Sequence, residues 1–485
     1  MVSVHHRRVE ELKHLEQRIF RELADNPELL SARHTELLRY AFGFARLSLV
    51  RTTHGDIDLF DYVAPFRHWF NDQLNYLTHA RHRVSILRPT PEEDVDWKGV
   101  SQLAETLYER LDTTRKHLLE TLSDELSEAR LEEEICQKRL VLVLGGGGGA
   151  GYPHLGVFSV VAELGLTPSL IVGSSMGALL GLFRAISLEY DPGAIALGLP
   201  RPSEFRRVFS TYRGFSRFGF PGAMELRIRP VAKEIFSTIL GQSVPPINET
   251  PIPLRPVVTG LRTGMGFALA EVEREISRSE RVASPLRVPR RLRLFFKTMQ
   301  TLLQNPRFLD EVVFGSDDGL QDVDIVDAVG FSCAVPGIIH YDIFRKDAEI
   351  ASRLRQIFQD RGFFRITDGG VVANVPSRIA WDCVQRGEIT HRNAFILSFD
   401  AMAPLLNTNA PFYPIERLIA TGTKQHIPYS DLHHAYRSPP SPMKLLQSYD
   451  SLQKVMAHTR EELAPSRDYI QLMMRPIPRW TQLAP

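Results

Sequence analysis

Two turns that each join an apolar strand to a helix lie within residues 139–184, and they constrain the fold more than any other feature. The first is an apolar run, Leu140 to Leu144, that ends in five consecutive glycines, Gly145 to Gly149. Such a run is typical of a buried strand, and a helix-like pattern from His154 to Leu164 follows it. Glycines at this junction let backbone N–H groups approach a bound atom, and the helix start adds partial positive charge. The first turn therefore predicts a site for an anion.

The second turn repeats this arrangement around a serine. An apolar run, Leu170 to Val172, precedes Gly173-Ser174-Ser175-Met176-Gly177 and then an Ala/Leu-rich helix. This is the nucleophile-elbow pattern, in which a sharp strand-to-helix turn presents the central serine, and Gly173 and Gly177 prevent clashes around it. A G-x-S-x-G occurs by chance in about one chain in ten of this length. Its position between a strand and a helix, after a glycine-rich loop, makes Ser175 the candidate nucleophile.

The glycine run lacks the companions of two nucleotide-binding motifs. A dinucleotide fingerprint needs an acidic residue about twenty positions further on, where this chain has Gly173-Ser174-Ser175. A phosphate-binding P-loop ends in Gly-Lys-Ser/Thr, where this chain has Ala150-Gly151-Tyr152. A flexible connector would be polar, whereas this run is flanked by a core-like strand and helix. An oxyanion hole serving Ser175 fits best, with N–H groups from Gly146, Gly147, Gly148 and Gly149.

These two turns, together with two later motifs, resemble the patatin-like phospholipases. The family pattern Gly-Gly-Gly-x-(Arg/Lys)-Gly-x-x-His-x-Gly-Val matches residues 146–157, with Ala150 where a basic residue is common. Phe331 to Pro336 is similar to the family's Ala-Ser-x-Ala-x-Pro block, and Thr367 to Pro376 matches its Asp-Gly-Gly block with a trailing Asn-x-Pro. The four blocks occur in the family's order across roughly residues 138–400.

The resemblance implies a serine acyl hydrolase that acts on ester lipids, with Ser175 as nucleophile and Asp368 as general base. The glycines after Asp368, beginning with Gly369, permit a tight loop at a strand end, where the carboxylate can point at the elbow. The expected cycle is acylation of Ser175, departure of an alcohol, and attack by water that Asp368 activates. This mechanism requires no metal or other cofactor. Phospholipase A, lysophospholipase and neutral-lipid lipase activities all remain open.

Two alternatives to this interpretation stay open. A conventional Ser-Asp-His esterase would recruit a histidine near the C-terminus, although none of the candidates follows an evident strand-end loop: His426, His433, His434 and His458. We expect His154 to pack or cap its helix rather than act as a base. A catalytically decayed lipid-binding or interaction protein is the second alternative. Intact Ser175 and Asp368 argue against decay, whereas Ala150 leaves room for it.

Strands that alternate with helices predict an α/β fold, patatin-like in type, in three layers, with a mostly parallel sheet and helices on both faces. We expect residues 136–485 to form the catalytic domain, with an irregular and helical insertion at about 200–320, and residues 1–135 to form a helical region of unknown role. Further strands are expected at 255–261, 393–399 and 468–473, a helix at 322–331, and N-terminal helices at 9–23, 28–50, 62–77 and 100–138.

Composition indicates which partners and which cellular compartment to expect for this chain. A net charge of +1 gives no global attraction to nucleic acid. Cys136, Cys333 and Cys383 form no disulfide framework, which is typical of a reducing compartment. The polar N-terminus carries no secretory signal pattern, and no apolar run of about twenty residues is present. We therefore expect a cytoplasmic protein with peripheral membrane contact at most.

Residues 289–304 offer a candidate for such contact. Pro289 suits the first turn of a helix, and an apolar stripe from Leu292 to Leu303 has basic residues, among them Arg290 and Lys297, beside it. A basic amphipathic helix of this kind can lie in a membrane interface. The alternative is that the stripe packs on the catalytic core while the basic residues face water.

Overall fold

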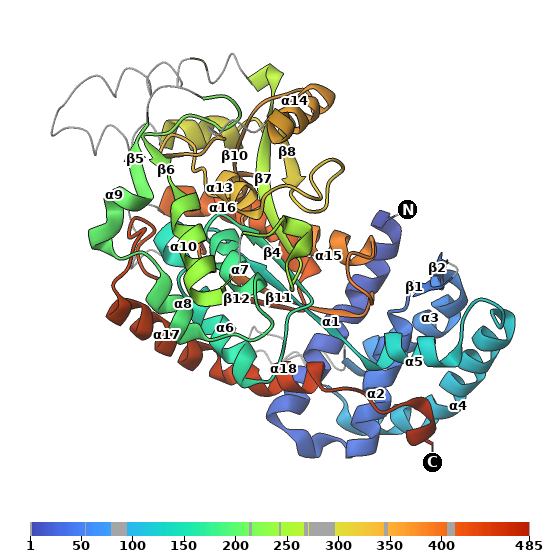
Figure 1. Cartoon of the computed structure of the whole chain (residues 1–485). Helices are drawn as coiled ribbons and strands as arrows, with labels where there is room; N and C mark the ends of the chain where they lie inside the picture. Colours follow the sequence, from blue (N-terminus) through green and yellow to red (C-terminus); the bar gives the residue numbers. More distant parts are fainter. Residues whose placement is uncertain are drawn as a thin grey trace, which may run out of the picture. The chain divides into compact units, whose positions relative to one another are not determined.

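The computed structural model describes residues 2–53, 55–78, 95–212, 216–241, 244–265, 270, 296–343, 348–404 and 413–484. Contacts within the chain divide it into two compact units (Figure 1). Unit 1 comprises Met1–Leu140, Asp382–Phe395 and Pro465–Pro485, and unit 2 comprises Val141–Trp381 and Ile396–Ala464. Unit 1 is thus assembled from three separate stretches of sequence.

A single large sheet forms the centre of unit 2 (Figure 1). The strands follow the order β10-β7-β4-β3-β11-β12, and β8 also pairs with β7. The pairs β3–β4, β4–β7 and β11–β12 are parallel, whereas β8 and β10 run antiparallel to β7. Their bounds are β3 Arg139–Leu144, β4 Leu170–Ser174, β7 Leu254–Arg262, β8 Leu309–Val313, β10 Phe363–Asp368, β11 Ala394–Asp400 and β12 Leu432–Ala435.

Helices flank this sheet and bury its central strands. Every residue of β4 and β11 is buried, as expected for parallel strands that are covered on both faces and therefore read as continuous apolar runs. Helix α7 packs against β4 and β7, α13 against β7 and β10, and α17 against α6. The predicted fold class, a mostly parallel sheet between helices, is confirmed. These helices are α6 His154–Glu163, α7 Met176–Ala185, α13 Ile325–Ser332, α15 Ser377–Gln385, α16 Tyr413–His426 and α17 Tyr449–Leu463.

A smaller sheet lies elsewhere in unit 2, in the order β5-β6-β9. Strands β5 and β6 are antiparallel, and β6 and β9 are parallel. The elements of this part are α8 Pro192–Gly198, α9 Phe205–Val208, β5 Phe209–Thr211, β6 Met224–Leu226, α10 Ile228–Leu240, β9 Ile339–His340 and α14 Ala348–Arg361.

Unit 1 is mainly helical, which confirms the helical N-terminal region. Its elements are α1 Val2–Asp25, α2 Ala32–Ala45, β1 Leu49–Thr52, β2 Gly55–Asp58, α3 Phe60–Thr78, α4 Trp97–Thr121, α5 Glu128–Cys136 and α18 Arg467–Met474. Phe42, Phe66 and Phe70 pack in its core with ring centroids 5.0–5.5 Å apart. The antiparallel β1–β2 hairpin was not expected from the sequence.

Two sequence expectations for unit 1 are wrong. The segment 468–473, expected as a strand, lies in helix α18 because its buried residues Tyr469, Ile470 and Met473 follow helical spacing. The single helix expected over 100–138 is two helices, because the Ser127 side chain accepts a hydrogen bond from the Arg130 N–H at 3.3 Å and starts α5 anew.

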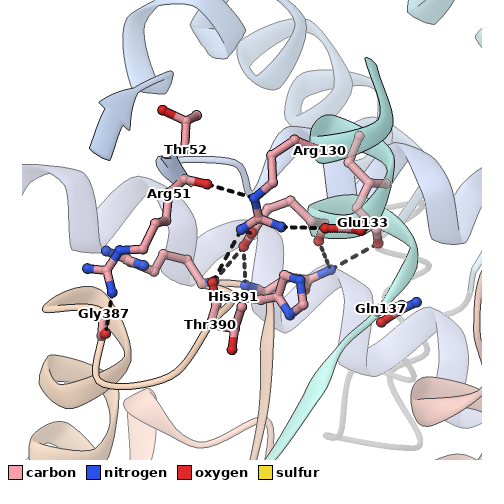
Figure 2. Close-up of polar contacts among 12 residues, drawn as sticks. Arg51, Thr52, Arg130, Glu133, Gln137, Gly387, Thr390 and His391 are labelled. Atoms are coloured by element: carbon pink, nitrogen blue, oxygen red, sulfur yellow. Dashed lines mark hydrogen bonds and ion pairs between the residues drawn. The ribbon is translucent and has the colours of Figure 1, made fainter. Parts of the chain in front are cut away.

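A polar network fixes the second stretch of unit 1 to its first (Figure 2). The Arg130 guanidinium donates to the carbonyl oxygens of Arg51 at 2.7 Å and Thr390 at 3.2 Å, and pairs with Glu133 at 3.2 Å. Arg51 in turn donates to the Gly387 carbonyl oxygen at 2.9 Å. The hairpin, α5 and the stretch 382–395 are therefore held together by hydrogen bonds from arginine side chains.

The predicted amphipathic segment is described only in its second half, where residues 296–303 are helical and 289–295 lie outside the described residues. Met299 is buried, and Phe296 and Leu303 pack against a cluster that includes Phe220 and Leu261. The described apolar residues thus pack on unit 2, and membrane contact through this segment stays a prediction. None of the helices seen in the described ranges has the length and apolar character needed to cross a bilayer.

Candidate active site

Ser175 occupies a strained turn between β4 and α7. Its backbone has φ 53° and ψ −123°, and no other non-glycine residue in the described part of the chain has a positive φ. Such a conformation costs about 1–3 kcal/mol and persists only where the surroundings impose it. A Cβ on Gly177 would collide with the Leu144 carbonyl oxygen, and one on Gly173 would lie 2.6 Å from the Ala178 nitrogen. The elbow pattern therefore folds as a sharp, glycine-dependent turn.

Two residues at the C-terminal end of α13 brace this turn. The Ser175 N–H donates to Ser332 Oγ at 3.0 Å, and the Ser332 hydroxyl donates to the Val257 carbonyl oxygen at 2.6 Å. The Cys333 thiol donates to the Ser175 carbonyl oxygen at 3.2 Å. From the sequence, the segment 331–336 was identified only by its similarity to a family block, so these polar contacts were missed. The Ser332 hydroxyl joins the elbow to β7.

Asp368 ends β10 and points back toward the elbow. Its Oδ1 accepts a hydrogen bond from the Gly370 N–H at 2.7 Å, which caps the short turn Gly369–Val371. The Asp368 N–H donates to the Ala334 carbonyl oxygen at 3.0 Å, and its own carbonyl oxygen accepts from Thr259 Oγ1 at 2.7 Å. A Cβ on Gly369 would collide with the Val257 carbonyl oxygen, so this position requires glycine. The backbone around the carboxylate is therefore rigid.

The Asp368 carboxylate is buried with few partners. The residue is 5% exposed, and among the residues that the structure describes Oδ2 has no hydrogen-bond partner. Burial raises the pKa of Asp368 to about 7, while the neighbouring Ser175 hydroxyl and the Gly370 N–H act in the opposite direction. The Ser175 hydroxyl is thus close enough to stabilise the ionised form of Asp368, although it does not complete a hydrogen bond to Oδ2. A base with a pKa near neutrality is suited to proton transfer, and such contacts often tighten only when substrate binds.

The glycine loop passes beside Ser175. A Cβ on Gly146 would lie 3.0 Å from the Ser175 Cβ. The Gly146 N–H donates to the Asn374 carbonyl oxygen at 3.1 Å, and the Gly149 N–H donates to that of Pro442 at 2.9 Å. Across the described residues, no acceptor is present for the N–H groups of Gly147 and Gly148. Of the four predicted donors, these two are the ones available to a ligand.

The histidines of the alternative triad contact other groups. His426 Nδ1 accepts from the Arg378 N–H at 3.4 Å, and His433 Nδ1 lies 3.0 Å from Ser398 Oγ. His434 and His458 lie 3.2 Å and 3.9 Å from Glu462 carboxylate oxygens. Burial lowers the pKa values of His426 and His433 to about 4. In the described ranges, none of these contacts reaches Ser175 or Asp368.

The fold and the family comparison define the class of protein. A mostly parallel sheet flanked by helices, with a serine at a strand–helix elbow, is the architecture of α/β acyl hydrolases. Residues 142–381 match the sequence model of a family described as Patatin-like phospholipase. Residues 142–381 therefore form a domain of this family, which confirms the resemblance found in the sequence.

Similar curated proteins are fungal lysophospholipases. The chain is 38% identical over 63 residues to Lysophospholipase NTE1 of Coccidioides immitis, an alignment that covers 13% of the chain and 4% of the relative. It is 43% identical over 61 residues to Lysophospholipase NTE1 of Mycosarcoma maydis, covering 13% of the chain and 3% of the relative. It is 40% identical over 63 residues to Lysophospholipase nte1 of Emericella nidulans, an alignment that covers 13% of the chain and 4% of the relative. The chain therefore spans only a small fraction of these relatives' length.

Proposed function

We propose that the protein is a serine hydrolase that cleaves ester bonds of lipids through a Ser175–Asp368 dyad. The observation that carries this proposal is Ser175 itself, which is held at φ 53° beside a buried carboxylate whose pKa is raised to about 7. Family membership and the lysophospholipase names of the similar proteins favour phospholipids and lysophospholipids as substrates. The named relatives make a lysophospholipid the first substrate to test.

In the proposed cycle, Asp368 moves the proton and Ser175 carries the acyl group. The Ser175 oxygen attacks the ester carbonyl carbon while its proton passes to Asp368. The carbon–oxygen bond to the alcohol then breaks, and Asp368 returns the proton to the departing alkoxide. Water attacks the acyl-enzyme, giving its proton to Asp368, and Ser175 recovers its own proton as the carboxylic acid leaves. Each half of the cycle begins with an ionised Asp368 and ends with its return to that form, so no second base is needed.

The oxyanion formed at each attack would be held by the glycine loop. The N–H groups of Gly147 and Gly148 are the donors in this proposal, because those of Gly146 and Gly149 already donate to carbonyl oxygens. Helix α6 follows the loop, and its N-terminal partial charge adds to the stabilisation. Loss of one such donor typically lowers kcat by about 10²–10³-fold.

Labelling with a fluorophosphonate tests the nucleophile. We expect the probe to label wild type and Ser174→Ala, and to leave Ser175→Ala unlabelled. Ser174 is a matched control because its hydroxyl is buried, adjacent and without a hydrogen-bond partner. A panel of lysophospholipid, diacyl phospholipid and triacylglycerol then identifies the substrate class. Wild-type turnover by Ser175→Ala would refute the proposal.

A histidine triad is tested by the same assay. Single changes to glutamine at His426, His433, His434 and His458 should leave most activity, because their contacts lie elsewhere. A loss of about 10²-fold or more from any one of them would favour the conventional mechanism.

A further inference from the structure

Hydrogen bonds hold the start of the glycine loop, at Gly145 and Gly146, just before the Gly147 N–H, which is its first donor available to a ligand. The Gly145 N–H donates to the Phe399 carbonyl oxygen at 2.9 Å, and the Gly145 carbonyl oxygen lies 2.8 Å from His154 Nε2. The next N–H, that of Gly146, donates to the Asn374 carbonyl oxygen at 3.1 Å. The peptide unit that joins Gly145 to Gly146 is therefore held at its oxygen and at its nitrogen. The following peptide unit carries the Gly147 N–H.

The contacts of His154 determine its tautomer. A carbonyl oxygen can only accept, so Nε2 must carry the hydrogen that it donates to Gly145. His154 Nδ1 lies 2.8 Å from the Tyr436 hydroxyl and therefore accepts from it. The residue is 0% exposed, and burial lowers the pKa of His154 to about 4. His154 is thus neutral near pH 7, with both ring nitrogens engaged.

Strands β11 and β12 hold Tyr436, the residue that donates a hydrogen bond to the His154 imidazole. Tyr436 directly follows β12, and its N–H donates to the Asp400 carbonyl oxygen at 3.1 Å. Its ring stacks on Phe399 of β11 with centroids 6.0 Å apart and an interplanar angle of 15°. Phe399 also accepts the Gly145 N–H, so the same strand end supports the loop and the tyrosine that orients His154.

We propose that His154 is a positioning residue for the oxyanion hole, acting through Gly145 to hold the Gly147 N–H in place. The inference rests on the proposed function and adds a role to a histidine that the sequence suggested only packs or caps. His154 transfers no proton in this role. The neutral Nε2–H tautomer, which the Gly145 carbonyl oxygen requires and the Tyr436 hydroxyl supports at Nδ1, fixes the Gly145–Gly146 peptide plane, and that plane sets the direction of the next N–H.

Matched variants at position 154 separate this role from simple packing. His154→Leu removes the bond to Gly145, and we expect kcat to fall by about 10²-fold with little change in KM. His154→Gln places an amide N–H near the position of Nε2 and should restore most of the lost kcat. His434→Gln is the control, since His434 contacts the Tyr436 ring with centroids 5.6 Å apart but does not bond to the loop.

Inhibitor affinity gives a readout that packing alone would not move. A trifluoromethyl ketone analogue of a lysophospholipid forms a tetrahedral adduct with serine, so its affinity should fall by the same factor as kcat. A non-hydrolysable ether analogue has no oxyanion, and its affinity should stay unchanged. Equal losses for both ligands, or no rescue by His154→Gln, would overturn the inference.

The remaining outcomes are also decisive. If wild type is neither labelled by fluorophosphonate nor active, the proposed function fails, and His154 is then not the cause. If His154→Leu does not fold, Tyr436→Phe replaces it, because that change removes only the hydroxyl that bonds to His154 Nδ1 and orients the imidazole. We expect Tyr436→Phe to lower kcat several-fold at constant KM. An unchanged kcat in folded Tyr436→Phe would overturn the inference.

Discussion

Asp368 in unit 2 and Glu134 in unit 1 are both buried carboxylates, but their surroundings differ. Glu134 is 1% exposed; its Oε1 accepts the N–H groups of Arg392 and Asn393, and its Oε2 accepts from Arg130 at 2.9 Å. Asp368 has one N–H donor, and its Oδ2 has none. Burial raises the pKa of both groups, and at Glu134 two N–H donors and the Arg130 charge oppose it.

The difference shows how burial alone fails to define a catalytic group. Donors and a cation around Glu134 replace the water that folding removes, and one of these donors is Arg130. Arg130 also reaches Arg51, Glu133 and Thr390, as Figure 2 shows. Asp368 has one oxygen, Oδ2, without a hydrogen-bond partner in the described part of the chain, and it lies beside a strained serine. An incompletely compensated charge costs stability, and such costs cluster at functional sites.

The largest expected effect comes from Asp368→Asn. Loss of the base should lower kcat by about 10²–10⁴-fold. Above pH 7 the variant should be at least as stable as wild type, because ionising a buried carboxyl group with a pKa of about 7, against an ordinary value of 3.8, costs at most about 4 kcal/mol. Lipid turnover and thermal unfolding measure the two effects. If Asp368→Asn were strongly destabilised but fully active, Asp368 would have a structural role like that of Glu134, and the proposed dyad would be wrong.

Activity should depend on pH through the same carboxylate. Because the ionised form is the base, kcat/KM should fall about tenfold per pH unit below a pKa near 7. The sign for folding is opposite: a raised carboxyl pKa means that this group's contribution to stability is lost as pH rises from about 4 to about 7. A pH–rate profile with a soluble ester checks the first trend. A profile that stays flat down to pH 5 would contradict it.

A smaller effect is expected at the brace of the elbow. Ser332→Ala removes the acceptor of the Ser175 N–H and should lower kcat about tenfold through misplacement of the nucleophile. It should also reduce the free energy of unfolding by about 1–3 kcal/mol, because a buried N–H loses its partner. Cys333→Ala removes only a weak thiol donor and serves as the control. Equal activity losses in the two variants would indicate general disturbance of the segment.

The smallest effect on activity is expected from Glu134→Gln. Its kcat should match wild type, while the free energy of unfolding falls by about 1–3 kcal/mol because charged hydrogen bonds are weakened. Glu133→Gln is the matched control: Glu133 is 53% exposed and also pairs with Arg130, so its loss should cost about 0–1 kcal/mol. Chemical denaturation of both variants decides the point. Reduced kcat in Glu134→Gln would remove the contrast between the two carboxylates.

Local pattern was enough to predict the elbow, the strand runs and the fold class. The runs at 140–144 and 170–172 are strands because both faces of the sheet are covered, so their apolar residues are continuous. The order of the motifs nominated Ser175 and Asp368 as a pair, and that pairing as a dyad remains a proposal. The structure shows the Ser175 hydroxyl close enough to influence the carboxylate.

Other features depend on contacts that no local pattern contains. Which glycine N–H groups stay available depends on the carbonyl oxygens of Asn374 and Pro442, far along the chain. The short apolar segment 468–473 fits a strand or a helix equally well by periodicity, and packing in unit 1 makes it a helix. The β1–β2 hairpin has no Asn-Gly or Asp-Gly turn signal in its sequence.

The division of unit 1 into three stretches has a consequence for biosynthesis. The Trp480 ring stacks on Tyr108 with ring centroids 4.5 Å apart, and the Trp480 backbone N–H donates to Glu132 Oε2 at 2.9 Å. These contacts join helices of the first stretch of unit 1 to its third stretch, which is translated much later. At about 5–20 residues per second, residue 465 is translated roughly 15–65 s after residue 140. The nascent helices must keep a surface uncovered for that interval, while most of unit 2 is still being translated.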